Sequence, residues 1–284
     1  MQPPTTLSLI SILDHIRLRL SEKFSGQELT DMALWLAEET TGLSRTALIV
    51  GKDTTNFSYS QIDAYIDRLL ADEPLAYVLG TTDWRGLRLK VNRHTLIPRP
   101  ETSELADIVL NDNGDSPRRV IDWCTGSGCI ALALKQRRLN WDIRGFDINS
   151  EAVATARENA ELNSLEVEFE QADIFAQTEN SNADIIVCNP PYIMESEREQ
   201  MEHSVLGFEP HQALFVSDDD PLLFYRAIAQ AHAAPLMYFE INPLCCNDLV
   251  NMLARYGYEA EVMTDFAGKQ RFIKCREIDK NKNL

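Results

Sequence analysis

The stretch VIDWCTGSGCIALAL, residues 120–134, is the part of this chain that indicates its fold most directly. It begins as an apolar run typical of a buried strand, turns at Gly126 and Gly128, and continues as a helix-like run. Glycine lets the backbone bend tightly and approach a ligand, and the free N–H groups at the start of the helix face the same point. We therefore expect a nucleotide-like cofactor at this turn. The residues expected to hold it are Cys124, Thr125, Gly126, Ser127 and Gly128.

The chain that follows alternates strand-like and helix-like segments. The runs RVIDWC, DIRGFDI, VEFE, DIIVCN and PLMYFEIN are strand-like, and the first several are separated by helical stretches such as SEAVATARENAELN. This alternation predicts an α/β fold with a mostly parallel, doubly wound sheet. Two further runs, EAEVMTD and QRFIKC, are joined only by DFAGK. We expect them to form an antiparallel hairpin that closes one edge of a seven-stranded sheet.

The N-terminal part has a different pattern. Over residues 5–75, apolar residues recur at spacings of three and four in segments broken by SG, TG and GKDTTN, which predicts a small bundle of about four helices. Residues 79–97 alternate apolar and polar side chains around a glycine, which predicts a β-hairpin. We expect a helical domain at residues 1–78, a β-hairpin linker at 79–97 and an α/β domain at 98–284. The alternative is that the helices belong to the main core.

The formal net charge of the chain is −17. A protein that grips a nucleic-acid duplex normally presents a basic face to the phosphates, so this charge argues against direct binding of nucleic acid. A local basic strip, WRGLRLKVNRHTLIPR at residues 84–99, contains no acid. Either the strip faces an acidic partner, or its cations guard the edge of the hairpin against strand pairing. The cations are Arg85, Arg88, Lys90, Arg93 and Arg99.

The cysteines, histidines and apolar segments bear on metal binding and on the cellular compartment of the protein. The six cysteines show no C-x-x-C spacing and are expected to be reduced, packed thiols. The five histidines are scattered singly, so no metal site is expected. The N-terminus does not have the pattern of a signal peptide, and no segment approaches the roughly 18 apolar residues of a membrane helix. We expect a cytoplasmic protein without a membrane partner.

Acidic residues after two later strands bear on the identity of the cofactor. Asp147 ends the run RGFD, where a carboxylate can accept hydrogen bonds from a ribose diol, and Asp173 and Ile174 follow the third strand. The turn GSGCIA also satisfies a pattern of nicotinamide dinucleotide enzymes. The run DWCTGSG resembles motif I of S-adenosylmethionine-dependent methyltransferases, a fold in which Asp173 and Ile174 would contact adenine. Both cofactors stay open on the loop alone, and the three features together favour S-adenosylmethionine.

The stretch IIVCNPPYI, residues 185–193, ends a buried strand in an unusual way. In a doubly wound sheet this segment emerges at the carboxyl edge, beside the cofactor turn. Proline fixes φ and has no N–H, so the segment is stiff and its carbonyls are free to accept. The Asn189 side-chain oxygen and the Pro190 carbonyl can each accept one N–H of a planar amino group, while the Tyr192 ring covers its flat face. We expect Asn189, Pro190, Pro191 and Tyr192 to bind substrate; Asn189, Pro190 and Tyr192 to be catalytic; and Asn189 also to face the cofactor.

The tetrapeptide NPPY resembles the signature of methyltransferases that act on the planar amino groups of adenine, cytosine or glutamine. With EPLAYVLG, LIPRPETSEL and FEPHQALF, it makes the chain similar to the protein-(glutamine-N5) methyltransferases that modify peptide chain release factors. This resemblance implies a class I S-adenosylmethionine methyltransferase fold and a substrate glutamine in the Gly-Gly-Gln loop of a release factor. It also implies that the N-terminal helices dock the substrate protein.

Other functions stay open at this point. A related group of enzymes methylates a glutamine of a ribosomal protein, and its motifs overlap with those quoted. A nucleic-acid amino-methyltransferase, a dinucleotide-dependent oxidoreductase and a cofactor-binding adaptor without catalysis are the remaining alternatives. For the leading function we expect a monomer with no Ser–His–Asp or Cys–His constellation, because methyl transfer to an amide needs alignment and not a strong base.

Overall fold

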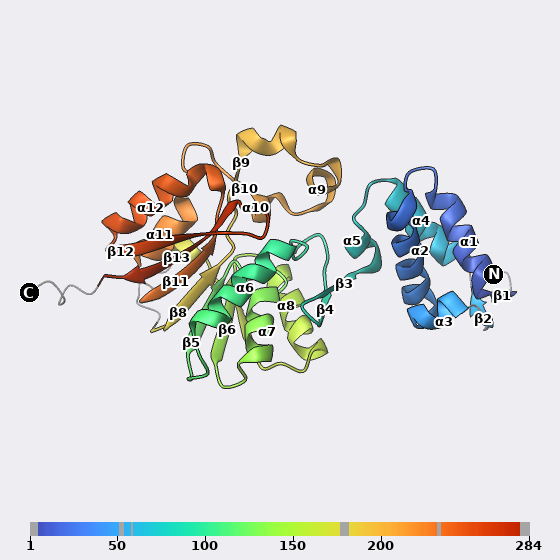
Figure 1. Cartoon of the computed structure of the whole chain (residues 1–284), viewed down its shortest axis with the longest axis horizontal. Coiled ribbons are helices and arrows are strands. Elements are labelled where there is room, and N and C mark those ends of the chain that lie inside the picture. The colour runs from blue at the N-terminus through green and yellow to red at the C-terminus, as the bar shows by residue number, and fades with distance from the viewer. Residues whose placement is uncertain (1–4, 51–53, 58, 177–181, 232–233, 279–284) are drawn as a thin grey trace, which may run out of the picture. The chain divides into compact units, whose positions relative to one another are not determined.

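The computed structural model describes residues 5–50, 54–57, 59–176, 182–231 and 234–278 (Figure 1). The chain divides into two compact units. The first contains Met1–Gly80 together with His203–Phe208, and the second contains Thr81–Glu202 together with Glu209–Leu284. Each unit has a hydrophobic core of its own. Within the described residues, no helix has both the length and the apolar character needed to cross a membrane.

The first unit is mainly helical, as predicted. Its helices are α1 (Leu9–Leu20), α2 (Gly26–Thr41), α3 (Arg45–Val50), α4 (Tyr59–Leu70), α5 (Leu75–Leu79) and α9 (His203–Phe208). Ile12 and Ile16 of α1 meet Ile62 and Ile66 of α4 in a core from which solvent is excluded, because apolar residues spaced by four share one helix face.

A small antiparallel sheet in the first unit departs from the prediction. Strand β1 (Thr5–Ser8) pairs with β2 (Thr54–Phe57), whereas the sequence analysis assigned residues 5–8 to the helical bundle and 54–56 to a break. Pairing between segments so far apart leaves no mark in the local periodicity.

The second unit is built on a seven-stranded sheet with the order β12-β13-β11-β8-β5-β6-β7. Its strands are β5 (Arg119–Trp123), β6 (Asp142–Asp147), β7 (Glu168–Gln171), β8 (Ile185–Cys188), β11 (Leu236–Glu240), β12 (Tyr258–Thr264) and β13 (Gln270–Glu277). All neighbours pair in parallel except β13, which runs antiparallel to both β11 and β12. The predicted doubly wound sheet with a closing antiparallel hairpin is confirmed.

Helices cover both faces of this sheet (Figure 1). Val120 and Ile185 point to a core shared with α6 (Pro100–Asp112), α7 (Cys129–Arg137) and α8 (Ser150–Leu162). Their neighbours Ile121 and Ile186 point to a core shared with α11 (Leu223–Gln230) and α12 (Cys246–Arg255). Both members of each pair are buried because successive side chains on a strand face opposite sides.

Short elements connect these layers. They are η1 (Ile174–Ala176), β9 (Ile193–Met194), η2 (Glu195–Gln200), α10 (His211–Leu214), β10 (Phe215–Val216) and η3 (Pro243–Cys245). Strands β9 and β10 form a parallel pair that links the segment after β8 to the segment before α11. All six cysteines are free thiols, as predicted.

The predicted β-hairpin is present but shorter than expected. Strands β3 (Thr81–Trp84) and β4 (Leu87–Lys90) are antiparallel, and the chain from 91 to 99 has no strand. Trp84 and Leu89 are buried in the core that also contains α6. The Asn159 side chain of α8 binds β4 like a strand partner: its Oδ1 accepts from the Lys90 N–H at 2.6 Å, and its Nδ2 donates to the Lys90 carbonyl at 3.0 Å.

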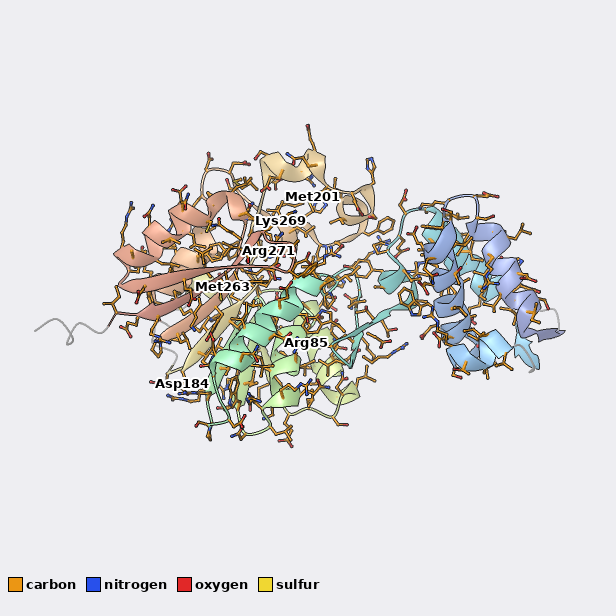
Figure 2. The ribbon with its side chains drawn as sticks, in the orientation of Figure 1. Arg85, Asp184, Met201, Met263, Lys269 and Arg271 are labelled. Carbon is orange, nitrogen blue, oxygen red and sulfur yellow. The ribbon has the colours of Figure 1, made fainter. Side chains whose placement is uncertain are left out.

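Most cations of the basic strip are paired within the same unit. Arg85, at the turn of the hairpin, donates to Asp107 at 2.6 Å and to the Ser103 carbonyl at 2.8 Å (Figure 2). The other ion pairs are Arg88 with Asp83, Lys90 with Glu158, and Arg99 with Glu209. These acids reduce the charge that the strip can offer to a partner.

Candidate active site

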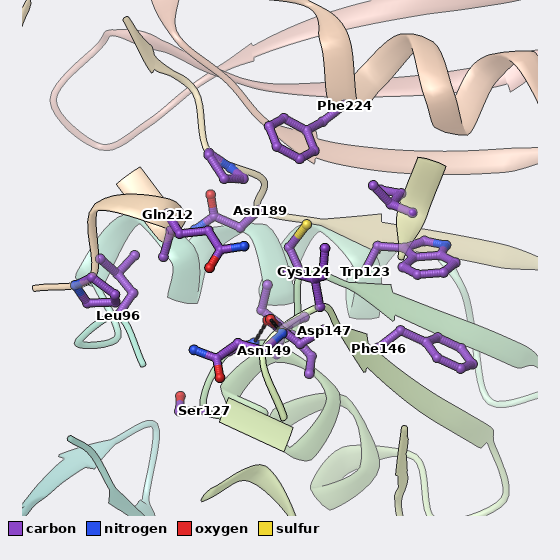
Figure 3. Close-up of a pocket in the computed structure, with 18 of the residues that line it drawn as sticks. Leu96, Trp123, Cys124, Ser127, Phe146, Asp147, Asn149, Asn189, Gln212 and Phe224 are labelled. Carbon is purple, nitrogen blue, oxygen red and sulfur yellow. Dashed lines mark hydrogen bonds between the residues drawn. The ribbon is translucent and has the colours of Figure 1, made fainter. Parts of the chain in front are cut away.

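A pocket of about 170 Å³, partly open to solvent, lies where β5, β6 and β8 end (Figure 3). This edge is the one at which doubly wound sheets bind ligands. Residues predicted from the sequence that line the pocket are Cys124, Thr125, Gly126, Ser127, Asp147, Asp173, Ile174, Asn189 and Pro191. Gly128, Pro190 and Tyr192 are close in the chain but are not among its lining residues.

The glycine-rich turn between β5 and α7 is tight. Cys124, Gly126 and Gly128 have φ values of 56°, 55° and 80°, which lie in the left-handed region that glycine tolerates best. The Gly128 N–H donates to the Thr125 carbonyl at 2.8 Å and closes the turn. A Cβ on Gly128 would lie 2.8 Å from the ring of Phe169, so this glycine serves packing under the pocket, whereas Gly126 lines the pocket itself.

Asp122 holds the turn from below. It is fully buried and accepts hydrogen bonds from the Thr125 hydroxyl at 2.6 Å and from the Ala131 N–H at 3.2 Å. Burial raises the pKa of Asp122 to about 7, against the lowering effect of these two donors. One side chain thus connects the end of β5, the turn and the first turn of α7.

Asp147 stands at the end of β6, where a ribose acid was predicted. Its two oxygens accept from the Gly126 N–H and the Asn149 N–H, both at 2.9 Å, which fixes the carboxylate against the glycine turn (Figure 3). Burial raises the pKa of Asp147, while these backbone donors lower it. Each carboxylate oxygen has more than one lone pair, so the side chain can still accept from a ligand.

One part of the pocket wall is apolar. Ile174 is 7% exposed there, and Phe175 and Phe224 form a tilted aromatic pair with ring centroids 5.2 Å apart. Both phenylalanines line the pocket. A flat aromatic base fits such surroundings, because stacking on rings buries its faces.

Asn189 follows the last residue of β8 and faces the pocket (Figure 3). Cys188 pairs with Trp123 of β5 in the parallel register, so the sheet itself brings Asn189 beside Cys124 and the glycine turn. The Asn189 Nδ2 donates to the Thr102 hydroxyl at 3.2 Å. Among the described residues, no group donates to its Oδ1, which is left as an acceptor.

Tyr192 is anchored by its hydroxyl. That hydroxyl donates to Glu240 Oε1 at 2.9 Å, and the Tyr192 carbonyl accepts from Asn242 Nδ2 at 3.1 Å. Burial, and after it the charge of Glu240, raise the pKa of Tyr192 well above its usual range. The phenol is therefore a hydrogen-bond donor at neutral pH and holds the NPPY segment to the end of β11.

Two of the sequence motifs meet in an ion pair. Arg99, from LIPRPETSEL, binds the buried carboxylate of Glu209, from FEPHQALF, and Glu209 also accepts from the Ile97 N–H at 3.2 Å. A buried carboxylate needs such partners, because it has given up its hydration. The pair joins the segment before α6 to the segment before α10, and both segments line the pocket.

Several lining residues were missed by the sequence analysis. Phe175 and Phe224 come from a 3₁₀ turn and an amphipathic helix, and nothing in their local pattern indicates a ligand. Gln212 also lines the pocket (Figure 3) and belongs to the motif FEPHQALF, which carries part of the family resemblance. The remaining missed residues include His94, Arg99 and Thr102. The motif that contains Arg99 and Thr102 was the available signal.

Comparison with known families gives two matches along the chain. Residues 11–80 match the family described as PrmC N-terminal domain, and residues 103–207 match the Methyltransferase small domain. The chain is 36% identical over 272 residues to the release factor glutamine methyltransferase of Bacteroides thetaiotaomicron, covering 92% of this chain and 98% of that protein. It is 36% identical over 269 residues to the protein of the same name from Flavobacterium psychrophilum, covering 90% and 94%.

A solved structure shares the fold at low sequence identity. A methyltransferase from Pyrococcus furiosus superimposes with a TM-score of 0.51 at 15% identity, covering 78% of this chain and 98% of that one. The similarity concerns the fold alone.

Proposed function

The chain belongs to the release factor glutamine methyltransferase family, and we propose that it transfers a methyl group from S-adenosylmethionine to a glutamine side chain of peptide chain release factors. The acceptor is the amide nitrogen of the glutamine in the Gly-Gly-Gln loop. The observation that carries this proposal is Asn189 Oδ1 at the pocket, beside the glycine turn, to which no group of the described residues donates.

The residues of the pocket fit the cofactor. When bound, S-adenosylmethionine supplies an electrophilic methyl group on a sulfonium. Cys124, Thr125, Gly126 and Ser127 would hold its amino-acid end, with Gly128 packed on Phe169; Asp147 would bind the ribose hydroxyls, and Asp173 and Ile174 would contact the adenine. Phe175 and Phe224 add an aromatic surface at the same end. The dinucleotide alternative loses its support with the family assignment.

The NPPY segment positions the acceptor. The Asn189 oxygen accepts one N–H of the glutamine amide, and Pro191 shapes the wall of the pocket. In this proposal the Pro190 carbonyl accepts the other N–H and the Tyr192 ring covers the flat face of the amide, although neither residue is among those that line the pocket. An amide nitrogen is a poor nucleophile because its lone pair is delocalised into the carbonyl. Acceptors placed on both N–H groups align the nitrogen and stabilise the positive charge that grows on it. The proton leaves after transfer, so no strong base is needed.

The rest of the chain supports docking of a protein substrate. Residues 1–78 form the docking module, 79–97 link it to the catalytic domain, and residues 98–284 carry the reaction. Binding remote from the reacting amide supplies affinity that the small amide cannot. The net charge of −17 supports a protein partner over nucleic acid. We propose that the protein acts as a monomer in the cytoplasm, where translation factors are.

The test uses purified protein, a release factor and methyl-labelled S-adenosylmethionine. We expect one methyl group on the Gln of the Gly-Gly-Gln loop, located by mass spectrometry, and no label on a release factor in which that Gln is replaced by Asn. A ribosomal protein glutamine substrate is offered in parallel. Labelling of the ribosomal protein but not of the release factor contradicts the proposed substrate, and cofactor binding without label on any protein would indicate an adaptor.

A further inference from the structure

A chain of hydrogen bonds runs from the pocket into the core of the second unit. Asn189 Nδ2 donates to Thr102 Oγ1 at 3.2 Å, and Thr102 Oγ1 donates to Glu240 Oε2 at 2.8 Å. Thr102 lies in the first turn of α6 and Glu240 ends β11, and they are only 3% and 1% exposed. Three elements distant in sequence therefore meet at the pocket, whose lining includes both Asn189 and Thr102.

The chemistry of these groups determines the direction of each bond. An ionised carboxylate, the form that accepts from both the Thr102 and Tyr192 hydroxyls, only accepts, and a hydroxyl has one proton to donate. Because Thr102 gives its proton to Glu240, the hydroxyl oxygen can only accept from Asn189. The Asn189 amide must therefore present its NH₂ to Thr102 and its carbonyl oxygen to the pocket. The opposite orientation would place two acceptors, or two donors, face to face.

The surroundings of Glu240 keep the carboxylate in place. Its Oε1 accepts from the Tyr192 hydroxyl at 2.9 Å, so both oxygens have donors. Burial raises the pKa of Glu240, while the Thr102 and Tyr192 hydroxyls, and then the charge of Arg271, lower it. Arg271, in the first residues of β13 (Figure 2), is itself paired with Asp265, and the further acid acting on Glu240 is Glu101.

We infer that Glu240 and Thr102 are positioning residues that set the amide of Asn189 with its oxygen toward the acceptor nitrogen. The inference rests on the proposed function, because an oxygen in this place matters only for a substrate that brings N–H groups. If the Asn189 amide were flipped, its NH₂ would face the N–H groups of the substrate amide, and no hydrogen bond could form. Preorganisation of this kind affects the rate more than the binding of cofactor, since its benefit grows with the charge on the reacting nitrogen.

The kinetic test compares two substitutions of the same residue, Thr102. Thr102→Val keeps the shape but removes the hydroxyl, and we expect turnover at saturating substrates to fall about 10–100-fold. Affinity for S-adenosylmethionine in calorimetry should stay within about twofold, and Thr102→Ser, which retains the hydroxyl, should recover most of the turnover.

Thr155→Val is the matched control. Thr155 is also a buried threonine that accepts from an asparagine, Asn92 Nδ2 at 2.9 Å, but it is not among the residues that line the pocket. We expect it to lose stability with turnover close to that of the parent protein. Equal loss of turnover in Thr102→Val and Thr102→Ser, or a similar loss in Thr155→Val, would show that Thr102 acts through packing alone and would overturn the inference.

A second measurement does not depend on activity. In ¹⁵N-labelled protein, the side-chain NH₂ signal of Asn189 is assigned by its absence in Asn189→Ala. Because one of its protons is hydrogen-bonded to Thr102, we expect this signal to shift in Thr102→Val and to return in Thr102→Ser. A signal that is the same in all three proteins contradicts the hydrogen bond. If the signal responds as expected but no release factor is methylated, the orientation of Asn189 stands and the proposed function is wrong.

Discussion

Asn189→Ala tests how the amide is activated, because it changes turnover and stability by different amounts. The side chain has one hydrogen bond within the described protein, to Thr102 at 3.2 Å, so its removal should cost about 1 kcal/mol of unfolding free energy. Its free Oδ1 is a preorganised acceptor at a site of developing charge. Loss of such a group typically lowers turnover by about 10²–10³-fold, or about 2.7–4 kcal/mol of transition-state stabilisation.

The assay measures methyl transfer at saturating release factor and saturating S-adenosylmethionine, with cofactor affinity followed by calorimetry. Asn113→Ala is the control, because Asn113 is an asparagine that donates to the Val109 carbonyl at 2.9 Å and the Tyr238 hydroxyl at 2.8 Å; it is buried, whereas Asn189 is partly buried, and it does not line the pocket. We expect the control to lose stability and keep turnover, and Asn189→Ala to lose turnover by about 10²–10³-fold with only about 1 kcal/mol of lost stability.

The refuting result is specific. If Asn189→Ala turns over at a near-normal rate and only its Michaelis constant for release factor rises, then Asn189 contributes equally to the ground state and the transition state. The account of amide activation by a preorganised acceptor would then have to be abandoned.

Three further predictions concern the cofactor turn and its support. Asp147→Ala should weaken S-adenosylmethionine binding by about 2–3 kcal/mol in calorimetry, with turnover at saturating cofactor largely retained; an unchanged affinity would make Asp147 a strand-end residue only. Gly128→Ala should lower the unfolding free energy by about 2–4 kcal/mol in denaturant titrations, because φ is +80° and the new Cβ meets Phe169 at 2.8 Å. Gly257→Ala, with φ +86° and open space, should lose only about 1–2 kcal/mol, and equal losses would remove the steric argument. Because burial raises the pKa of Asp122 to about 7, its stabilising contribution is full below the usual aspartate pKa and is lost as pH rises through 7. The stability of Asp122→Asn relative to the parent should therefore increase by about 2 kcal/mol from pH 5.5 to 8, and a constant difference would mean that Asp122 titrates normally.

The sheet and the place of the site could be predicted from local patterns in the sequence. Continuous apolar runs such as residues 185–188 indicate strands buried on both faces, and the glycines at 126 and 128 mark the turn between strand and helix. Parallel strands end at the same edge, so the positions of Asp147 and Asn189 near the turn followed from strand order alone. These features are local, and each can be derived from a short window of residues.

The groups that hold the site in its geometry depend on the packing of distant segments and could not be predicted from the sequence. Thr102 and Glu240 are 138 residues apart, and Arg99 and Glu209 are 110 apart, yet in each pair the first residue donates a hydrogen bond to a buried carboxylate. The hydrogen-bond partner of a buried polar side chain depends on how α6 packs on the sheet and on where the segment before α10 lies against it. The spacing of apolar residues in the sequence contains no information on these contacts. For the same reason the Phe175–Phe224 pair was not predicted: two rings from separate segments become one surface only when burial of apolar area brings them together.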